Sequence, residues 1–353
     1  MRRLLWIIPA LVFLVPAAAA LWPHAGYQGP VSDHFDGKLF HNGKPFEKNA
    51  LDLLRYWWQR EPGMWKRDLR IAPGPKPLAI VGEGGLRATV VNHATVLIQA
   101  DGLNLLTDPI WSERASPVQW AGPRRFVPPG IRFEDLPHID AVLISHNHYD
   151  HLDLPTLKRL KTAHDPMFYV GLGEGATLRE VGISKITELD WWQSASLPNG
   201  RKLWGAQSVH WCGRGLGGRN QSLWLSYVIE TAGGPVYFAG DTGYGPQFKG
   251  ARQRFGPMRL ALLPIGAYKP RWLTAYQHID PTEAVRAHVE LDAAASLAVH
   301  FGTFELSDDG QHEPVDALAR ALAAASLPAG AFTAPTFGSG YDFAPAAMHE
   351  DSP

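Results

Sequence analysis

Three histidines and two aspartates fall within nine residues of the sequence, in SHNHYDHLD at positions 145–153. If the chain leaves a strand in extended form there, the side chains of His146, His148 and Asp150 point to the same side. His151 follows Asp150 directly and points elsewhere. This arrangement suits two ions side by side, with the two alternate histidines on one and Asp150 with His151 on the other. Neutral imidazole and carboxylate are ligands that suit zinc and related first-row metals.

Later segments of the chain supply further ligands of the same types. His210 in SVHWC, Asp241 in FAGDTGY and His300 in AVHFGTF each follow an apolar run, where loop residues gather at the rim of a sheet. Asp241 has two carboxylate oxygens and could bridge both ions. Structural zinc sites are closed and four-coordinate, usually with cysteine ligands. Seven nitrogen and oxygen ligands shared by two ions leave room for water, so we expect a catalytic site rather than a structural one.

The elements that must position these ligands are short apolar strands separated by turn residues. IDAVLIS is a buried strand that ends at His146, and residues 86–110 predict successive strands with a turn at Asp101-Gly102. Further strand candidates are MFYVGL, RKLWGAQSVHW, SLWLSYVIET, PVYFAGD, LALLPIG and SLAVHFG. Helical patterns lie at LPTLKRL, with Asp153 as its cap, and around residues 246–255, 281–292 and 314–326. We therefore expect an α+β fold with layered sheets and helices outside.

The first 22 residues have the pattern of a signal peptide or N-terminal anchor. Arg2 and Arg3 precede the apolar stretch LLWIIPALVFLV, and small residues suited to cleavage follow near Ala18 or Ala20. We expect export, which places the protein in the periplasm or at a membrane. An uncleaved anchor is the alternative, although the apolar run is near the lower limit for spanning and Pro9 interrupts it.

Residues 23–80 are expected to form an N-terminal extension with one helix, ahead of a main domain at residues 81–345. In NALDLLRYWWQREPGMWKR, Leu51, Leu54 and Trp58 recur at helical spacing until Pro62 and Gly63 break the pattern. We expect this helix to pack on the domain. The alternative is a membrane-interface helix, since Trp with Lys and Arg suits the depth of lipid headgroups.

Composition narrows the classes of function. The formal net charge of −1 and the absence of a long run of Lys or Arg argue against a nucleic-acid partner. Cys212 is the single cysteine, so no intrachain disulfide can form. His93 lies beside a strand end and is left undecided. Eight other histidines occur in polar or linker contexts and are assigned no role: His24, His34, His41, His138, His164, His288, His312 and His349.

The ligand pattern resembles that of the metallo-β-lactamase superfamily, αββα hydrolases in which two mainly antiparallel sheets pack face to face with helices outside. Within that superfamily the sequence is similar to the N-acylphosphatidylethanolamine-hydrolysing phospholipase D family. The motifs that carry this similarity run in order across roughly residues 85–315. They are GPRRF, TDPIWSERASP, LISHNHYDHLD, ELDWW, HWC, FAGDTGY, RFGP, PIGAYKPRW, YQHIDPTEAV and HFGTF.

The resemblance implies two zinc ions in the hydrolase domain, although other first-row metals also suit these ligand types. It implies His146, His148 and His210 on one ion. It implies Asp150, His151 and His300 on the other, with Asp241 bridging both. A homodimer, and a groove that faces lipid at a membrane surface, are implied as well.

Two metals about 3.5–4 Å apart hold a hydroxide at neutral pH and clamp both sides of an in-line displacement at phosphorus. We therefore expect phosphodiester hydrolysis by attack of the metal-bound hydroxide, with N-acylphosphatidylethanolamine-like phospholipids as the substrates that the resemblance implies. Asp150 and Asp241 would accept protons besides binding metal. Asp108 in LTDPI is expected to orient a ligating histidine, although an Asp before Pro is also a common turn residue.

Gln277 and His278 match the YQH segment of the family, so we expect both at the substrate pocket and His278 among the catalytic residues. The alternative is that they only lead into a helix that starts at Asp280-Pro281.

Other enzymes of the same fold remain as alternatives. Metal-activated hydroxide attacks an ester carbonyl equally well, so a lactonase or esterase is the main competitor. A β-lactamase of the common type needs a cysteine ligand, and Cys212 lies in no matching motif. A metallo-ribonuclease would share all seven ligands, but the export signal and the neutral charge oppose it. From a different class, a non-catalytic periplasmic zinc-binding or lipid-binding protein is also kept.

Overall fold

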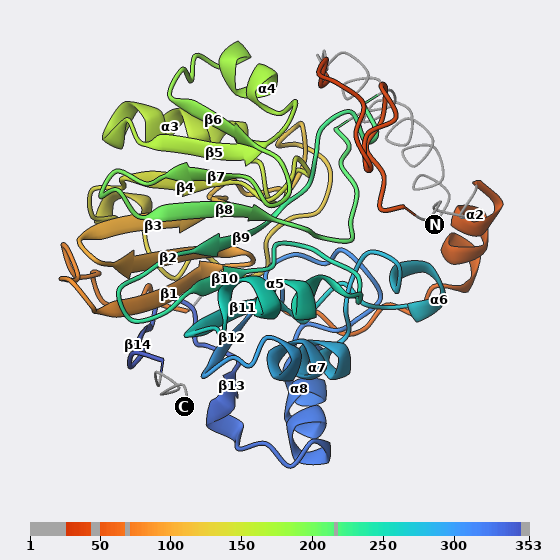
Figure 1. Cartoon of the computed structure of the whole chain (residues 1–353). Coiled ribbons are helices and arrows are strands. Elements are labelled where there is room, and N and C mark those ends of the chain that lie inside the picture. The colour runs from red at the N-terminus through yellow and green to blue at the C-terminus, as the bar shows by residue number, and fades with distance from the viewer. Residues whose placement is uncertain (1–25, 44–49, 68–70, 215–217, 347–353) are drawn as a thin grey trace.

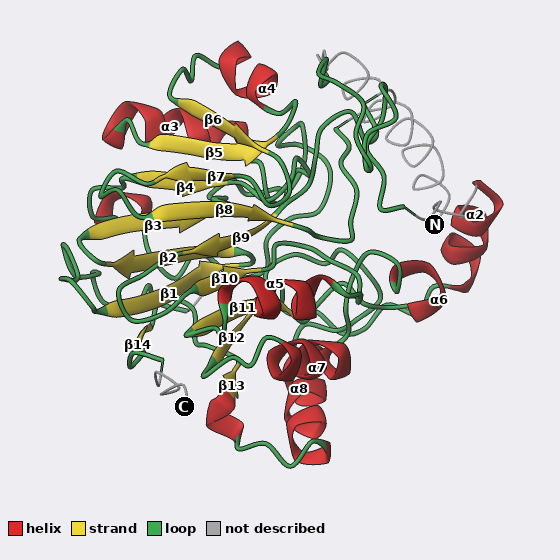
Figure 2. Ribbon diagram, viewed as in Figure 1, coloured by secondary structure: helices red, strands yellow, loops and turns green. Residues whose placement is uncertain are grey.

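The computed structural model describes residues 26–43, 50–67, 71–214 and 218–346. Within them, two seven-stranded sheets pack face to face and helices cover the outer faces, as Figures 1 and 2 show. The α+β sandwich expected from the sequence is therefore confirmed. The signal peptide or anchor expected at residues 1–22 lies outside the described residues. Among the described helices, none has the length and apolar character needed to cross a membrane.

The first sheet contains the strands that lead to the HxHxDH segment. Its strand order is β14-β1-β2-β3-β4-β5-β6. The strands are β1 (Leu86–Asn92), β2 (Thr95–Ala100), β3 (Leu103–Thr107), β4 (Ala141–Leu143), β5 (Met167–Gly171), β6 (Ile186–Leu189) and β14 (Gly340–Asp342). The predicted turn at Asp101-Gly102 joins β2 to β3, and both residues have positive φ there.

The second sheet contains the strands that precede the later ligands. Its order is β13-β12-β11-β10-β9-β8-β7. The strands are β7 (Ser194–Ser196), β8 (Lys202–Ala206), β9 (Ser226–Ile229), β10 (Val236–Phe238), β11 (Leu260–Pro264), β12 (Ser296–Val299) and β13 (Phe332–Thr333). Every strand candidate named from the sequence is a strand in the structure, whereas β6, β7, β13 and β14 were not foreseen.

The sheets are mixed rather than mainly antiparallel, which corrects the sequence-based expectation. In each sheet three neighbouring pairs are antiparallel and three are parallel. Parallel neighbours need a crossover connection. Helices supply most of these connections: α3 (Leu154–His164), α4 (Gly175–Glu180), α5 (Gln247–Phe255), α7 (Pro281–Glu290) and α8 (Glu313–Ala324). The physical cause is thus the run of strand–helix–strand units in both halves of the chain.

Helix starts follow the predicted capping signals only in part. Asp280 accepts hydrogen bonds from the backbone N–H groups of Thr282 and Glu283 and completes a capping box for α7. Asp153 stands at the N-cap position of α3, but its carboxylate accepts no hydrogen bond from the helix backbone. It accepts from the backbone and hydroxyl of Ser112 and from the Thr156 hydroxyl instead. The structure thus confirms its N-cap position, but its side chain ties α3 to the loop after β3 instead of capping the helix backbone.

The main core lies between the two sheets, where side chains such as Val90 and Leu143 meet Phe238 and Val299. A second apolar cluster joins the first sheet to α3 and α4, and a third joins the second sheet to α5, α7 and α8. Burial on both faces explains why the strands read as continuous apolar runs rather than alternating ones.

The N-terminal arm, residues 26–43, packs into this core. Phe35 and Phe40 are each 1% exposed and belong to the main cluster. His34, to which the sequence assigned no role, is buried with its ring between Asp190, at 2.8 Å, and Asp33, at 2.5 Å. The arm is therefore fastened to the domain along its length.

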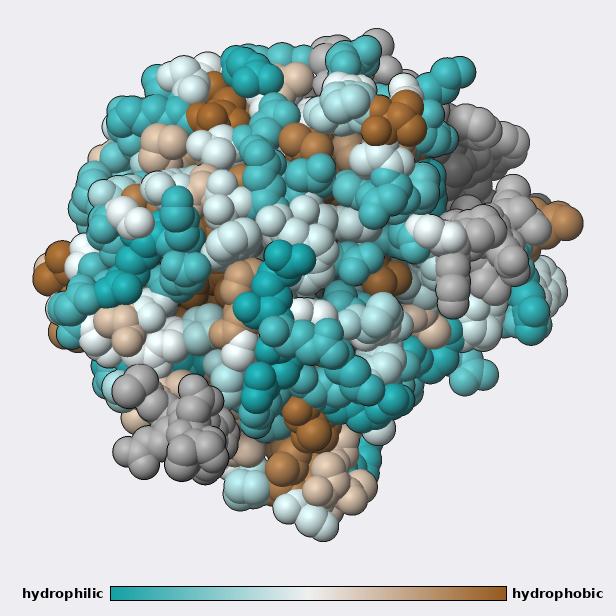
Figure 3. All heavy atoms as spheres, in the orientation of Figure 1, coloured by the Kyte–Doolittle hydropathy of each residue, from teal (hydrophilic) through white to brown (hydrophobic). Residues whose placement is uncertain are grey.

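Helix α2 (Ala50–Gln59) forms where the sequence predicts it, but the expected packing of its apolar side is wrong. Leu54, Trp57 and Trp58 are 65%, 66% and 89% exposed, and Met64 beyond the helix is 78% exposed. The helix is held by polar contacts, because the Tyr56 hydroxyl donates to Asp308 at 3.1 Å. Figure 1 places α2 at the outer end of the molecule beside α6 (Arg271–Thr274), and Figure 3 shows hydrophobic atoms at that margin.

Candidate metal centre

The predicted ligands come together at one edge of the sandwich. Strands β3 and β4 are parallel neighbours, as are β10, β11 and β12, so their carboxyl ends lie at common sheet edges. Asp108 follows β3, His146 follows β4, Asp241 follows β10 and His300 follows β12 directly. His210 lies in the loop beyond β8. Residues more than 150 positions apart in the sequence therefore share one site because their strands end on the same side.

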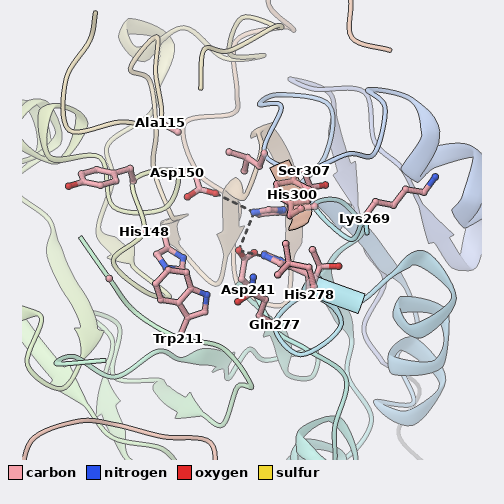
Figure 4. Close-up of a pocket in the computed structure, with 17 residues that line it drawn as sticks. Ala115, His148, Asp150, Trp211, Asp241, Lys269, Gln277, His278, His300 and Ser307 are labelled. Carbon is pink, nitrogen blue, oxygen red and sulfur yellow. Dashed lines mark ion pairs between the residues drawn. The ribbon is translucent and has the colours of Figure 1, made fainter. Parts of the chain in front are cut away.

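The carboxylate of Asp241 lies at the centre of the site, among imidazole rings from four histidines. Its Oδ2 lies 3.2 Å from His151 Nε2, 3.1 Å from His300 Nε2, 4.0 Å from His146 Nε2 and 3.9 Å from His210 Nε2. One oxygen atom thus faces imidazole nitrogens from both predicted ligand sets. Figure 4 shows Asp150 and Asp241 both directed at the His300 ring. This is the position that a bridging ligand must occupy.

The set of Asp150, His151, His300 and Asp241 has the spacing of a tetrahedral metal site. Asp150 Oδ2 lies 3.2 Å from His151 Nε2 and 3.3 Å from His300 Nε2, and Asp241 Oδ2 lies 3.2 and 3.1 Å from the same two nitrogens. Ligand atoms bound at about 2.0–2.1 Å to a tetrahedral zinc are separated by about 3.3–3.4 Å. These four separations therefore suit a small first-row ion.

The other set consists of His146, His148 and His210. His148 Nδ1 lies 2.8 Å from His146 Nε2 and 3.3 Å from His210 Nε2. His148 thus presents Nδ1, whereas its two partners present Nε2. The three nitrogens lie together, and these are the three residues that the resemblance assigns to one ion.

Hydrogen bonds fix which nitrogen of three ligating rings carries the proton. His151 Nδ1–H donates to Asp108 Oδ2 at 2.7 Å, and the fully buried Asp108 carboxylate also accepts from the backbone and hydroxyl of Ser145. His146 Nδ1 lies 2.9 Å from the Ser145 hydroxyl, and His210 Nδ1 lies 2.9 Å from the Gln277 carbonyl oxygen. Each arrangement leaves Nε2 as a lone-pair donor toward the centre. Asp108 is thus placed where a residue that orients a ligating histidine must be.

The electrostatics also suit metal binding. Burial lowers the pKa of His148 and of His210 to about 3, which keeps both imidazoles neutral and able to bind a metal. Burial opposes ionisation of Asp241, but the imidazoles of His300 and His151 outweigh it and hold the pKa of the carboxyl well below its usual range. Burial likewise opposes a charge on His300, yet Asp241 and Asp150 raise its pKa to about 9. Asp241, Asp150 and Asp108 likewise raise the pKa of His151 well above its usual value against the effect of burial. In the metal-free protein protonated imidazole therefore takes the place of the cation.

Several buried polar atoms of the site make no hydrogen bond within the described structure. They are His151 Nε2, His300 Nε2, Asp241 Oδ1, His278 Nδ1 and His148 Nε2. Buried polar groups are almost always satisfied, so such a concentration of exceptions at one place indicates a missing ligand. The donor atoms, all imidazole nitrogen and carboxylate oxygen, fit two first-row metal ions.

A pocket of about 370 Å³ opens onto the centre, and both Gln277 and His278, which the resemblance assigns to the substrate pocket, line it. His278 Nδ1 lies 3.8 Å from Asp241 Oδ2, and burial lowers the pKa of this imidazole to about 3. Trp211, which follows His210, lines the pocket, and its indole N–H makes no hydrogen bond to any described residue. Figure 4 shows these side chains around the opening.

Three residues near the site were missed or left open by the sequence. The ring of His93 contacts Asp150 at 2.9 Å. The Asn42 amide donates to the His210 carbonyl at 2.7 Å and accepts from the Trp224 indole at 3.0 Å, which ties the N-terminal arm to the site. These contacts join segments far apart in the chain, and no local spacing pattern indicates them. Trp211 is adjacent in sequence to the predicted ligand His210, and this adjacency was the only sequence feature that could have indicated its place at the site.

Comparison with known proteins agrees with this geometry. Residues 103–301 match the family described as Beta-lactamase superfamily domain. The N-acyl-phosphatidylethanolamine-hydrolyzing phospholipase D 1 of Caenorhabditis elegans is 38% identical over 247 residues, covering 67% of this chain and 69% of that protein. An uncharacterized protein of Mycobacterium tuberculosis is 43% identical over 238 residues, covering 66% of this chain and 62% of its own length.

Among solved structures, the isothiocyanate hydrolase from Delia radicum gut bacteria has a TM-score of 0.58 at 22% identity, covering 73% of this chain and 99% of that one. At this identity the likeness shows the fold alone. The family match and the sequence relatives go further, and the chain belongs to the beta-lactamase superfamily as a metal-dependent hydrolase. Within the superfamily it is related to the N-acylphosphatidylethanolamine-hydrolysing phospholipases D.

Proposed function

We propose that the chain is a binuclear zinc phosphodiesterase of the phospholipase D type, acting on phospholipids such as N-acylphosphatidylethanolamine. The observation that carries the proposal is the position of Asp241 Oδ2 between two sets of imidazole nitrogens, beside an open pocket. The similarity to the Caenorhabditis elegans enzyme supplies the substrate class.

When bound, the two ions would supply an activated water and positive charge against the phosphate. The residues of the chain perform the remaining tasks. Asp150 lines the pocket and is ionised, since the imidazoles around it outweigh the effect of burial and lower its pKa well below the usual range. It can therefore accept the proton that the attacking water loses. His278 stands on the pocket wall as a neutral imidazole and can donate a hydrogen bond to the phosphate or to the leaving oxygen.

Further groups suit recognition of a phosphodiester. The indole N–H of Trp211, which makes no hydrogen bond within the described residues, is a donor for a phosphoryl oxygen, and Gln277, which also lines the pocket, offers an amide. Lys269 lines the pocket as well, with its ammonium paired to Glu313. Together these groups offer neutral donors close to the ions and one cation further out.

A membrane surface is the proposed source of the substrate, and α2 is the proposed contact. Leu54, Trp57, Trp58 and Met64 are strongly exposed, and Tyr56 on the same helix lines the pocket. An apolar helix side that carries Trp suits insertion at headgroup depth. Docking through α2 would bring the pocket opening to the lipid.

Changing Trp57 and Trp58 together to Ser tests this contact. Loss of two exposed indoles that would insert into the bilayer should weaken binding to phospholipid vesicles about tenfold or more, with hydrolysis of soluble bis-p-nitrophenyl phosphate unchanged. Vesicle co-sedimentation measures the binding, and Val289→Ser, an exposed apolar residue on α7, is the control. Unchanged vesicle binding by the double variant would refute the role of α2.

The substrate itself is tested by mass spectrometry of lipids after incubation of zinc-loaded protein with N-acylphosphatidylethanolamine vesicles. The proposal expects phosphatidic acid together with N-acylethanolamine, and loss of both products in the double variant His146→Ala, His148→Ala. Parallel assays with bis-p-nitrophenyl phosphate, a lactone and a cephalosporin separate the alternatives. A protein that binds two ions and cleaves the lactone but no phosphodiester would be a lactonase, and the proposal would be wrong.

Export to the periplasm or to a membrane is proposed from the pattern of residues 1–22. Fractionation of cells that produce the full chain, with N-terminal sequencing of the product, tests it. Cytoplasmic protein that retains Met1 and does not sediment with membranes would contradict it.

A further inference from the structure

His93 occupies the turn between β1 and β2, and its ring lies against Asp150 and His151 of the HxHxDH loop. Its backbone has φ +44°, a left-handed conformation that is uncommon for a non-glycine residue. The backbone is held on both sides, since His93 N–H donates to the Thr303 hydroxyl at 2.9 Å and its carbonyl accepts from His300 N–H at 2.8 Å. The main chain of His93 therefore sets the position at which His300 leaves β12.

The ring of His93 contacts the carboxylate of the same ligand set. Its Nε2 lies 2.9 Å from Asp150 Oδ2, the oxygen that also faces His151 and His300. Its Nδ1 is buried without a hydrogen-bond partner in the described structure. An N–H buried without an acceptor costs more than a bare lone pair, so the proton belongs on Nε2, where it is donated to Asp150. The ring is 1% exposed and lies 4.0 Å from the His300 ring, which leaves it little freedom to turn away.

We infer that His93 is a positioning residue for one of the two ions: it fixes the metal-facing oxygen of Asp150 by a hydrogen bond and sets His300 through its main chain. His93 thus orients Asp150 through a hydrogen bond, just as Asp108 orients His151. Hydrogen-bond partners of this kind hold a ligand in its binding geometry, and their loss typically weakens metal binding 10–100-fold. The proposal rests on the metal centre and is independent of which substrate the enzyme hydrolyses.

Two variants separate the hydrogen bond from the shape of the ring. His93→Phe keeps a ring of similar size and the backbone contacts but removes the donor, whereas His93→Gln carries an amide N–H that can reach Asp150. His138→Phe, at a largely exposed histidine remote from the site, is the matched control. The probe is Co²⁺ titrated into the metal-free proteins, followed by its d–d absorption, together with zinc content after dialysis.

We expect the wild type, the control and His93→Gln to take up two equivalents, with at most a few-fold weakening in the Gln variant. His93→Phe should bind the first equivalent normally and the second about 10–100-fold more weakly. The unfolding midpoints of the metal-free proteins show whether weaker metal binding in a variant reflects poorer folding. If the hydrogen bond is what matters, the Gln variant must recover metal binding as well as stability. Wild-type affinity for both ions in His93→Phe would overturn the inference. So would equal loss in the Phe and Gln variants, which would make His93 a direct ligand, and so would a wild type that binds a single ion.

Discussion

Asp241 lies where one side chain could serve both of the proposed metal sites. Its Oδ2 faces four ligand imidazoles, and its Oδ1 is buried without a partner among the described residues. A buried carboxylate is costly unless positive charge or hydrogen bonds compensate it. In the metal-free protein the protonated imidazole of His300 provides that compensation, and metal ions would provide it in the loaded enzyme.

Replacing Asp241 by Asn removes the charge and keeps the size of the side chain. We expect the protein to retain at most one tightly bound ion and kcat/KM for phosphodiester hydrolysis to fall roughly a thousandfold, since a charge at the reacting centre is lost. Elemental analysis and steady-state kinetics measure the two effects. Asp165→Asn, at the exposed C-cap of α3, is the matched control. Two ions and near-normal turnover in Asp241→Asn would exclude the bridging role.

The raised pKa of His300 gives a pH dependence with a definite sign. Asp241 and Asp150 raise this pKa to about 9 against the effect of burial, so His300 is protonated below that pH in the metal-free protein. A metal ion must displace the proton, and the apparent Kd for zinc should therefore rise as the pH falls below about 9. Calorimetry at pH 7.5 in two buffers of different ionisation enthalpy should show net proton release. A binding enthalpy that does not depend on the buffer would contradict this.

At the scale of the elements, apolar runs in the sequence located the strands that precede the ligand residues. His146, Asp241 and His300 each come soon after a buried apolar run, and parallel neighbours end at the same edge. The pairing order was not readable, since an apolar run buried on both faces looks the same in parallel and antiparallel neighbours. The role of His93 was left open for a related reason: its partner Asp150 lies 57 positions away on a different turn, and local sequence does not indicate such a contact.

Exposure was the other property that local patterns could not give. Helical spacing correctly predicted α2, but the pattern cannot tell whether an apolar helix side meets protein or lipid. His34 shows the converse, because a histidine in a linker-like context is buried in an ion pair with Asp190. Both outcomes depend on the packing of segments distant in sequence.

The contact between His34 and Asp190 makes attachment of the arm depend on pH. Burial opposes the charge on His34, but Asp190 and Asp33 outweigh it and raise the pKa. Because the folded pKa lies above the unfolded value of 6.5, the contribution to stability is fully present below pH 6.5 and is lost as the pH rises through the folded pKa. Asp190→Asn should therefore lower the melting temperature more at pH 5.5 than at pH 8.5. Equal losses at both pH values would show that the charge is not involved.

At the scale of the whole molecule, the residues of the metal centre are distinct from the contacts that hold the C-terminal edge of the first sheet. Tyr56 of α2 lines the pocket together with Asp150, Asp241 and His300 of the candidate metal centre. The C-terminal strand β14 forms an edge of the first sheet, away from α2 (Figure 1). That edge depends on Arg259, which is 1% exposed and donates to three carbonyl oxygens, those of Gly84, Phe343 and Ala344. The homodimer that the resemblance implies stays a prediction.

Arg259→Met tests this separation. The substitution leaves three carbonyl groups without their donor, so the free energy of unfolding should fall by about 2–4 kcal/mol. Urea denaturation should show a lower midpoint at an unchanged m-value. Zinc stoichiometry should stay at the wild-type value, because none of the acceptors belongs to the metal centre. Loss of metal at temperatures where the variant is folded would contradict the separation.

The central claim is that two metal ions bind side by side and share Asp241. Anomalous diffraction from crystals of the zinc-loaded protein, recorded on both sides of the zinc absorption edge, tests it most directly. We predict two peaks about 3.5–4 Å apart, one against His146, His148 and His210 and the other against Asp150, His151 and His300, with the Asp241 carboxylate between them. A single peak, or two peaks of which only one touches Asp241, would contradict the account.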